Sequence, residues 1–555
     1  MASVLIQILS VFAGTWFAWR FLKRFVLKDP FAHLQGPPSP SFITGCMEML
    51  FSKEGLGYHD QLVKTYGRLF RVPGLFNSTL LYVYDPKALH HILIKDTHIF
   101  EEGSDFLLTS KTVFGKGLVA VVDDDHRRQR KMLNPVFSIK HMREMTPTFY
   151  GIVHKLRDSI TKQVSQGEEK IDILSWMTRT ALELIGQSGF GYSFDSLEHD
   201  APEHPYSASI KNYLSALNTP LLALTRIFLL PYVHNLGSPR FQRAVISALP
   251  WKGLHDVRDI VDVMDKTAVE IFESSKRALN DSESDMSQRV GGGKDIMSIL
   301  LRENINASAE DKLPDEEILA QISTFIFAGM DTTSNALART IDLLSEHQDI
   351  QDKLRKEISE ACGSHEGDLD YDTLTQLPFL DAVCRESLRL HPPGPFVMKE
   401  AIADGVLPVS KPIITNDGRE INEVFVPKGT MLFLSLYQCN REPEIWGPDA
   451  AEWNPERWMS PLPSTVTDAR IPGIYSNLMT FLGGSRSCIG FKFSQLEMKT
   501  VLSVLVQRFK FTPSGKKVIW QNNGIMQPTT EDAPRTAMGH RQLGLPVHIS
   551  FVNSG

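Results

Sequence analysis

Apolar and polar residues are spaced along most of the chain with the rhythm of secondary structure. From about residue 140 to residue 280, apolar positions recur with the spacing of amphipathic helices. The segments 67–84 and 405–436 instead alternate apolar and polar residues between turn residues, a pattern typical of short hairpins. The sequence therefore predicts a mainly α-helical fold with a minor β region.

The first 28 residues have a different pattern. Residues 2–19 are mostly apolar and, as a helix rising about 1.5 Å per residue, would reach about 27 Å, close to the thickness of a bilayer core. The basic residues between 20 and 28 follow this stretch, whereas a secretory signal peptide carries its charge before the apolar run. Because basic flanks stay cytoplasmic, we predict a single membrane anchor with the rest of the chain facing the cytosol. An interfacial helix is the alternative, since three polar residues weaken the span.

Residues 29–45 separate this anchor from the rest of the chain. Their segment Gly36-Pro-Pro-Ser-Pro40 favours a stiff, extended hinge over a helix. We therefore predict an anchor with its basic flank at 1–28, a proline-rich hinge at 29–45 and a single globular domain at 46–555.

Composition narrows the class of protein. A net charge of −7 argues against nucleic-acid binding, which would need a basic footprint. The 5 cysteines are scattered and lack C-x-x-C spacing, so neither a disulfide framework nor a zinc or iron–sulfur site is indicated. The chain is typical of a globular protein in a reducing compartment.

One stretch, Phe481-Leu-Gly-Gly-Ser-Arg-Ser-Cys-Ile-Gly490, concentrates the candidate chemistry. Around Cys488, Gly484 and Gly490 permit the backbone to wrap tightly beneath a flat ligand. Phe481 can cover the sulfur with apolar surface, and Arg486 can meet an anion. Such a loop suits a cysteine thiolate that binds haem iron. The alternative is that Cys488 is a small buried hydrophobe, as free cysteines usually are.

A second stretch interrupts the apolar face of a predicted long helix. Pro314-Asp-Glu-Glu317 provides a proline and acidic residues at the helix start. An apolar run follows and is then broken by Ala328-Gly-Met-Asp-Thr-Thr333. A hydroxyl and a carboxylate inside a buried helix must be either satisfied or useful. For Thr332 the alternative is a hydrogen bond back to its own helix carbonyl.

Two charged pairs have helical spacing. His126 and Arg130 are four residues apart after three aspartates that favour a helix start, so they share one face. Glu386 and Arg389 are three residues apart, which brings their charges together. A solvated charged face and a common surface pair, respectively, are the alternatives.

These motifs, in the order in which they occur along the chain, resemble those of the cytochrome P-450 superfamily of haem-thiolate monooxygenases. The pattern Phe481-x-x-Gly484-x-Arg486-x-Cys488-x-Gly490 is specific because it fixes five positions. The segment at 328–333, the Glu386-x-x-Arg389 pair and Trp453-Asn-Pro-Glu-Arg-Trp458 extend the resemblance. It implies the cytochrome P-450 fold for residues 46–555, preceded by the N-terminal membrane-anchor helix.

The resemblance implies roles for individual residues. Haem b would be the cofactor, with the Cys488 thiolate on its iron. Thr332 would hydrogen-bond the bound oxygen and Asp331 would relay protons to it. The residues expected around the haem are Cys488, Arg486, Phe481, Gly484, Gly490, Arg130, His126, Ala328 and Gly329. The residues expected to hold the cysteine loop through a buried network are Glu386, Arg389 and Arg457.

Two positions depart from the family's usual pattern. His126 stands where tryptophan is common, although it can still donate a hydrogen bond to a haem propionate. Lys399 falls where many relatives have arginine, and lysine keeps the charge but loses the bidentate fork.

The sequence also gives expectations for three further segments. Residues 106–122 are predicted to form a pliable loop, with Phe106, Leu108 and Phe114 as candidate substrate contacts or as ordinary packing residues. The apolar segment 221–230 fits either a membrane-surface helix or a core helix. Residues 522–530 resemble a turn that enters the active site in relatives.

The implied activity is insertion of one oxygen atom from O₂ into a lipophilic small molecule. NADPH would supply electrons through a separate flavoprotein reductase, because the sequence has no Rossmann fingerprint of its own. Cytochrome b5 would be a further electron donor. The resemblance to fungal microsomal members implies an endoplasmic reticulum location and a terpenoid, sterol or related secondary metabolite as substrate. The alternatives are a haem-thiolate isomerase or dehydratase that needs neither O₂ nor reductase, and a non-catalytic haem or lipid carrier.

Overall fold

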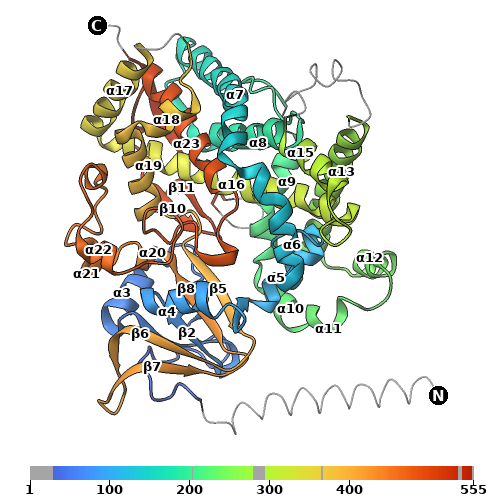
Figure 1. Ribbon diagram of the computed structural model, residues 1–555, viewed down its shortest axis with the longest axis vertical. Helices are drawn as coiled ribbons and strands as arrows, with labels where there is room; N and C mark the ends of the chain where they lie inside the picture. Colours follow the sequence, from blue (N-terminus) through green and yellow to red (C-terminus); the bar gives the residue numbers. More distant parts are fainter. Residues whose placement is uncertain (1–28, 203, 279–293, 364–366, 536–540, 553–555) are drawn as a thin grey trace.

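The computed structural model describes residues 29–202, 204–278, 294–363, 367–535 and 541–552. The expected anchor at 1–28 lies outside them. Helices form most of the body, and small sheets lie at one end and along one edge (Figure 1). The prediction of a mainly α-helical fold with a minor β region is confirmed.

The longer helices enclose the core. They are α3 (Leu56–Tyr66), α5 (Ser104–Phe114), α6 (Asp123–Leu133), α7 (Ile139–Ser165), α8 (Ile173–Phe190), α9 (Pro205–Leu217), α10 (Pro220–Phe228), α12 (Pro239–Ala248), α13 (Lys252–Ala278), α15 (Ile296–Asn306), α16 (Asp315–Glu346), α17 (Gln348–Gly363), α19 (Pro378–Leu390) and α23 (Phe491–Arg508). Shorter helical segments connect them. These are α2 (Met47–Leu50), η1 (Leu75–Asn77), α4 (Pro86–His90), η2 (His91–Lys95), η3 (Asn134–Phe137), α11 (Leu230–Val233), α18 (Tyr371–Gln376), α20 (Leu436–Cys439), α21 (Pro443–Trp446), η5 (Pro455–Trp458), α22 (Ser464–Asp468) and η6 (Gly484–Arg486).

Within the described residues, the strands form four small sheets. The largest has the order β1-β2-β8-β5-β3, and the predicted hairpin at 67–84 supplies its antiparallel pair β1–β2. Its strands are β1 (Leu69–Pro73), β2 (Thr79–Val83), β3 (Phe100–Glu102), β5 (Phe396–Ala401) and β8 (Met431–Ser435). The others are the pair β6 (Gly405–Ile414) and β7 (Glu420–Val426), the hairpin β10 (Val518–Asn522) and β11 (Met526–Thr530), and the sheet of β4 (Lys170–Asp172), β12 (Pro546–Phe551) and β9 (Phe509–Pro513).

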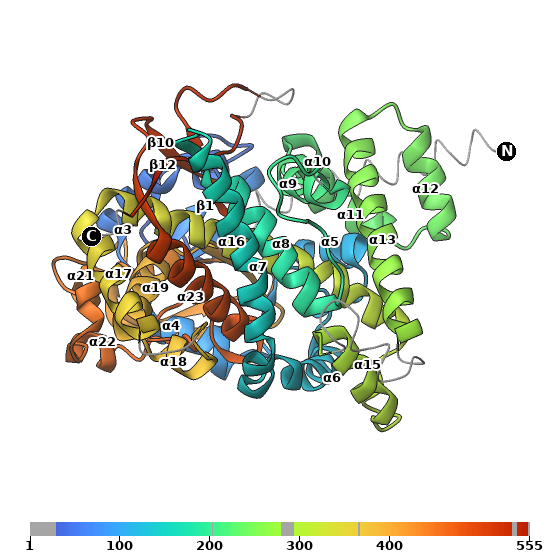
Figure 2. The same ribbon diagram turned by 90° about the horizontal axis from the view of Figure 1, so that it is seen from above.

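The longest helix, α16, organises the helical part. Its first turn holds three acidic residues, whose charge is stabilised at a helix N-terminus. It packs against α8, α13, α19, α23 and strand β11. Figure 2 places α16 between α19 and α23 on one side and α8 and α13 on the other. Most of its residues are therefore buried, so any accessible position in its middle is informative.

Helix α5 corrects one prediction. Residues 104–114 form a helix where the sequence was expected to give a pliable loop at 106–122. The glycines that suggested flexibility lie outside it, because Gly103 precedes the helix and Gly115 ends it with φ +84°. Phe106 is exposed, whereas the Phe114 ring packs against Tyr213 and Phe327.

The segment 221–230 also has a defined environment. Leu221 is 60% exposed and Leu224 is 39% exposed on α10, and only Leu222 of this helix is buried. The core-helix alternative is therefore wrong. Figures 1 and 2 both place α10, α11 and α12 at one end of the molecule, away from α17, α19 and α23.

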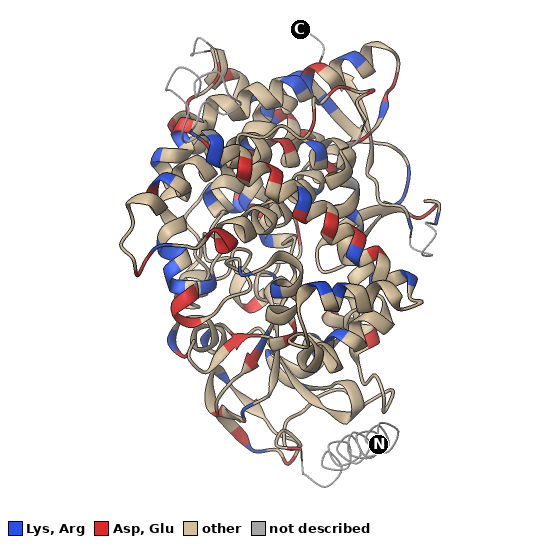
Figure 3. Cartoon of the chain, turned by 90° about the vertical axis from the view of Figure 1, so that its right-hand side faces the viewer, with Lys and Arg blue, Asp and Glu red and all other residues tan. Residues whose placement is uncertain are grey.

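The proline-rich segment after residue 28 packs on the body. Phe31 and Leu34 are buried, and the Gln35 carbonyl accepts a hydrogen bond from the Arg71 N–H in β1. Among the residues that the structure describes, none of the helices combines the length and apolar character needed to cross a bilayer. Acidic and basic residues are interspersed along the helices, as the colours of Figure 3 show.

Candidate active site

The Cys488 loop is a tight turn between η6 and the start of α23. The Cys488 N–H donates a 2.9 Å hydrogen bond to the Phe481 carbonyl, which closes the turn. Gly484 has φ +71°, and a Cβ there would lie 1.8 Å from the Leu93 carbonyl oxygen, so the fold requires glycine at this position. Gly490 differs because a Cβ there would meet no protein atom within 4 Å. No neighbouring atom of the described residues therefore requires a glycine at position 490.

The Cys488 sulfur faces an internal surface. Its side chain is accessible to a water-sized sphere, yet burial raises the pKa of the thiol, which the Gly490 N–H and then the Arg130 guanidinium lower. An accessible but desolvated thiol lies inside the protein rather than on its outer surface. The Phe481 ring packs edge-on against Tyr475 and Phe491 behind the loop.

The middle of α16 presents a second internal surface. Ala328 is exposed and Gly329 and Thr332 are half-buried, although the flanking Ile326 and Met330 are buried. The small side chains of this segment therefore line open space within the core. Phe327, next to Ala328, packs against Phe114 of α5, so this space has an aromatic wall.

Asp331, on the same helix, is buried, and its side chain is hydrogen-bonded to two other side chains. Its carboxylate accepts hydrogen bonds from the Asn335 amide at 3.1 Å and from the Gln527 amide of β11 at 3.3 Å. Burial raises the pKa of Asp331 to about 6, while the Gln527 and Asn335 donors lower it. The group can thus exchange a proton near neutral pH.

Thr332 makes the helix back-bond that was considered as its alternative role. Its hydroxyl donates to the Ala328 carbonyl at 2.7 Å. Because the hydroxyl proton is used in this bond, the Thr332 oxygen keeps its lone pairs for an acceptor role towards the accessible surface.

A cluster of cations surrounds the Cys488 loop. The Arg130 guanidinium donates to the Ser487 carbonyl at 2.6 Å and to the Ser487 hydroxyl at 3.3 Å. Burial, and then the charges of Arg486, Arg130 and Lys399, lower the pKa of His126 to about 4, so this imidazole is neutral at pH 7. His126 and Arg130 share one face of α6, as their spacing predicted.

Two of these cations already have carboxylate partners from β3. Arg486 lies 3.0 Å from Glu101, and the buried Lys399 lies 2.7 Å from Glu102. Sequence reasoning missed both glutamates, which are separated from their partners by about 300 residues or more. Arg130 has no carboxylate partner among the described residues.

Glu386, Arg389 and Arg457 form a buried network behind the loop. Arg389 makes two 2.8 Å bonds to the Glu386 carboxylate, and Arg457 lies 3.4 Å from it. Arg389 also donates to the carbonyls of Asn440, Ala450 and Glu452, which explains how a fully buried guanidinium is satisfied.

Asn440 connects this network to the cysteine loop. Its side chain accepts from the Met479 N–H at 2.8 Å and donates to the Thr480 hydroxyl at 2.9 Å, just before Phe481. Asn440 belongs to none of the motifs that the sequence showed, so its role was not predicted.

These features fit a haem group. An accessible, desolvated cysteine thiol offers an axial ligand, and the accessible segment of α16 offers small side chains and a hydroxyl. Arg130, which has no carboxylate partner in the described part of the chain, offers a cation for an anionic propionate, and neutral His126 offers a hydrogen bond.

Comparisons with known proteins point to one family. The family model described as "Cytochrome P450" matches residues 35–533. "Cytochrome P450 monooxygenase 91" of Postia placenta is 47% identical over 516 residues, which cover 93% of this chain and 94% of that protein. "Ganoderic acid synthetase CYP5150L8" of Ganoderma lucidum is 41% identical over 536 residues, 96% of this chain and 97% of its own. "Cytochrome P450 monooxyhenase eriI" of Hericium erinaceus is 36% identical over 538 residues, 96% of each chain.

Proposed function

The chain belongs to the cytochrome P450 monooxygenase family, whose members bind haem through a cysteine thiolate, and from this premise we propose that it oxygenates a terpenoid or related lipophilic metabolite. One oxygen atom from O₂ enters the substrate, and NADPH supplies electrons through a separate flavoprotein reductase. Cytochrome b5 is a further candidate electron donor. The observation that carries this proposal is the pairing of an accessible, desolvated Cys488 thiol with an accessible, polar segment in the middle of α16.

The cysteine loop has the task of holding the cofactor. Cys488 is the proposed axial ligand, and the Gly490 N–H tempers the thiolate charge by donating to its sulfur. Arg130 and His126 are the proposed propionate contacts, and Arg486 joins them from the loop itself. When bound, the haem supplies the binding and reductive cleavage of O₂.

The proposed role of the polar segment of α16 is proton transfer. Asp331, with its pKa of about 6, can take up and release a proton at cytosolic pH, while Asn335 and Gln527 fix its carboxylate. Thr332 stands next in the chain with an oxygen that can accept a hydrogen bond at the accessible surface.

The aromatic wall supports a lipophilic substrate. Phe114, Tyr213 and Phe327 contact one another edge-on or tilted beside Ala328, so the space next to α16 is bounded by apolar rings. One relative is named for the synthesis of ganoderic acid, a terpenoid, which agrees with a substrate of this class.

An exposed apolar surface supports attachment to the endoplasmic reticulum membrane. It is formed by the outward residues of α10–α12 and is named here the α10–α12 apolar surface; its members are Leu221, Leu224, Ile227, Leu229, Tyr232, Leu236, Phe241, Val245 and Leu249. Phe76 contacts Phe228 of α10, and the Phe76 N–H donates to the Ile43 carbonyl. Exposed Phe42 and Ile43 therefore bring the segment that follows the proposed anchor at 1–28 close to α10.

Turnover of the reconstituted protein tests the proposed reaction. We expect product from a terpenoid panel to require NADPH, reductase and O₂ together. In Thr332→Ala, NADPH consumption should continue while product per NADPH falls at least fivefold, because the acceptor oxygen at the α16 surface is lost.

Thr340→Ala is the matched control for that change. Thr340 makes the same back-bond, 2.8 Å to Ala336, on the same helix but in a fully buried position. Its product per NADPH should stay at the wild-type ratio. Turnover without NADPH would favour the isomerase or dehydratase alternative, and unchanged coupling in Thr332→Ala would contradict the proton-transfer role.

A further inference from the structure

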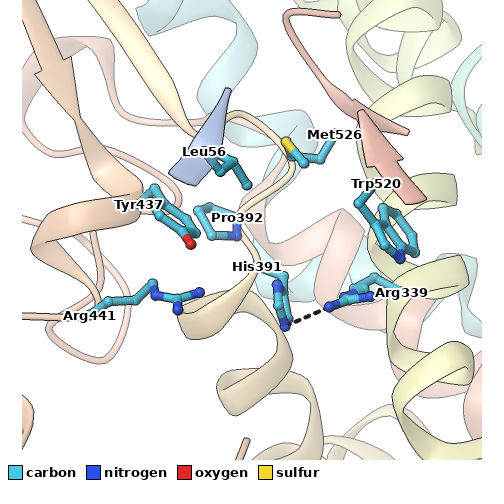
Figure 4. Close-up of a pocket in the computed structure, with 8 residues that line it drawn as sticks. All are labelled: Leu56, Arg339, His391, Pro392, Tyr437, Arg441, Trp520 and Met526. Atoms are coloured by element: carbon cyan, nitrogen blue, oxygen red, sulfur yellow. Dashed lines mark hydrogen bonds between the residues drawn. The ribbon is translucent and has the colours of Figure 1, made fainter. Parts of the chain in front are cut away.

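A second cavity, of about 230 Å³, lies beside the carboxyl-terminal half of α16. Side chains from five separate parts of the chain line it: α3, α16, the segment after α19, the segment from α20 to Arg441, and the hairpin β10–β11. Figure 4 shows Arg441 and Tyr437 on one side of this cavity and Arg339 and Trp520 on the other. None of the proposed haem contacts lines it.

The two arginines differ in how their charge is balanced. Arg339 stacks 4.8 Å from the Trp520 ring centre and pairs with Asp342 at 2.9 Å. Arg441 stacks 4.4 Å from the Tyr437 ring centre, and within the described part of the chain its guanidinium has no hydrogen-bond acceptor. The cavity therefore contains one positive charge without an anion.

Other polar groups of the cavity wall also offer hydrogen-bond donors. The Arg339 Nε is buried and lacks an acceptor in the region that the structure describes. The Arg339 Nη2 donates to the His391 Nε2 at 3.1 Å, which makes His391 a neutral imidazole with its proton on Nδ1. Burial, and then the charges of Arg339, Arg441 and Arg389, hold the pKa of His391 well below its usual value. His391 thus contributes a donor rather than a charge.

The rest of the wall is apolar. Leu56, Pro392 and Met526 cover the space between the two arginines (Figure 4). Inorganic phosphate would bring more negative charge than the single unpaired cation can balance, and it would bury its oxygens against these side chains. A flat apolar body with one carboxylate matches both the charge and the surface, because guanidinium groups bind planar carboxylates in a bidentate manner.

We propose that this cavity is a second ligand site, separate from the reaction centre, that binds a small aromatic carboxylate through Arg441. The volume sets the size of the ligand, since it is smaller than the roughly 300–1,000 Å³ of pockets for drug-sized molecules. A single-ring carboxylate is the size class that fits.

The site has a direct connection to Asp331. Met526 and Gln527 are adjacent in β11, so their side chains point to opposite faces of the hairpin. Met526 lines the cavity, and Gln527 donates to the Asp331 carboxylate. A ligand that packs against Met526 and Trp520 therefore stabilises the hairpin that positions Asp331. The effect of this on catalysis rests on the proposed function, whereas the binding itself does not.

Binding of benzoate to the holoenzyme is the test. The protein is first saturated with imidazole, which occupies the haem iron, and benzoate is then titrated by isothermal calorimetry. We expect one saturable benzoate site, at least tenfold weaker binding of the neutral isostere benzamide, and at least a tenfold loss of benzoate affinity in Arg441→Leu. Arg508→Leu is the control, because Arg508 is also stacked on a ring, 5.1 Å from the Phe551 centre, at a remote exposed position.

Met526→Trp provides an independent check because it fills the cavity without removing a charge, and it should also abolish benzoate binding. Hydrogen exchange of residues 518–530 should slow when benzoate binds the wild type. No benzoate binding, equal affinities in wild type and Arg441→Leu, or equal binding of benzamide would overturn the site. Binding without slower exchange would overturn its connection to the hairpin. None of these readouts uses turnover, so failure of the proposed oxygenation would be seen separately.

Discussion

At the scale of single residues, burial disfavours the charged forms of His126 and Asp331 in the site. The pKa of His126 falls to about 4 and that of Asp331 rises to about 6. The positive charge around Cys488 therefore comes from Arg130, Arg486 and Lys399 rather than from the imidazole. Asp331 is the proposed proton carrier because it titrates nearest to neutral pH.

Asp331→Asn should stabilise the protein while it impairs turnover. The folded-state pKa of Asp331 lies above the ordinary value of 3.8, so the cost of ionising it in the fold is absent below about pH 3.8 and complete above about pH 6. The neutral amide removes this cost, which amounts to about 3 kcal/mol in the free energy of unfolding above pH 6. Denaturant midpoints of the holoprotein at pH 4.5 and 7.5 measure it, and the gain should be larger at pH 7.5.

Asp342→Asn on the same helix gives the opposite expectation. Asp342 is an ion-pair partner of Arg339 and accepts from the Trp520 indole at 3.0 Å, so its neutralisation should lower stability at pH 7.5. A loss of stability in both variants would contradict the account of Asp331.

Some site residues could be proposed from the sequence because a motif contains them. Cys488, Arg130 and the Glu386 network were proposed from motifs, and the structure gives each of them specific partners. Gln527 was missed because its contact with Asp331 spans 196 residues and has no local signal. Only the fold shows that Thr332 makes its back-bond while it borders accessible space.

At the scale of elements, a charged network joins α19 to the cysteine loop. Arg389 of α19 holds the Glu386 carboxylate and three carbonyls of the segment at 440–452. The Asn440 side chain then binds the backbone N–H of Met479, near the start of the loop. The elements that carry the proposed cofactor ligand are thus positioned by buried hydrogen bonds as well as by apolar packing.

Arg389→Met should destabilise the protein strongly and reduce its haem content. The change leaves Glu386 buried with one weaker cation, Arg457 at 3.4 Å, at a cost on the order of 3–5 kcal/mol. Denaturant unfolding and the haem-to-protein absorbance ratio measure the two effects.

Lys356→Met is the matched change at an exposed ion pair. Lys356 and Glu360 lie 3.9 Å apart on the surface of α17, where such pairs contribute only about 0–1 kcal/mol. Equal losses of stability in the two variants would refute the structural role of the Glu386 network.

Element prediction depended on the regularity of the local pattern. The hairpin β1–β2 and the start of α16 follow directly from alternation, turn residues and acidic first-turn residues. Helix α5 was missed because the glycines on either side of it suggested a loop, although they mark its ends. Its stability comes in part from the packing of Phe114 on Phe327 and Tyr213, which no local pattern contains.

At the scale of the whole molecule, exposed apolar side chains gather at one end, which we propose faces the membrane. The α10–α12 apolar surface and the exposed Phe42 and Ile43 near the start of the described chain lie together through the contacts of Phe76. A lipid bilayer is the occupant that fits, because the segment preceding residue 29 is itself apolar and basic.

Membrane binding without the proposed anchor tests this orientation. A protein that begins at residue 29 should still float with phosphatidylcholine vesicles that contain anionic lipid. The double change Leu221→Gln and Phe241→Gln should reduce the bound fraction at least threefold, because both side chains are about 60% exposed on the α10–α12 apolar surface. Ile305→Gln removes an equally exposed apolar side chain from α15 and should leave flotation unchanged. Equal loss in both variants would contradict a defined membrane face.

The overall fold was predictable because its motifs are widely distributed, from His126 to Gly490. The second cavity was not, because its wall combines residues as far apart as Leu56 and Met526 with no motif among them. Sequence patterns indicate what each segment does locally, and cavities arise only when distant segments meet.

The bond that we propose between the Cys488 sulfur and haem iron can be tested with one spectrum. The purified holoprotein is reduced under carbon monoxide, and the Soret band is compared between wild type and Cys488→Ser. We expect the strongly red-shifted band of thiolate-ligated haem in the wild type and its loss in Cys488→Ser. The same red-shifted band in both proteins, or its absence from the wild type, would contradict it.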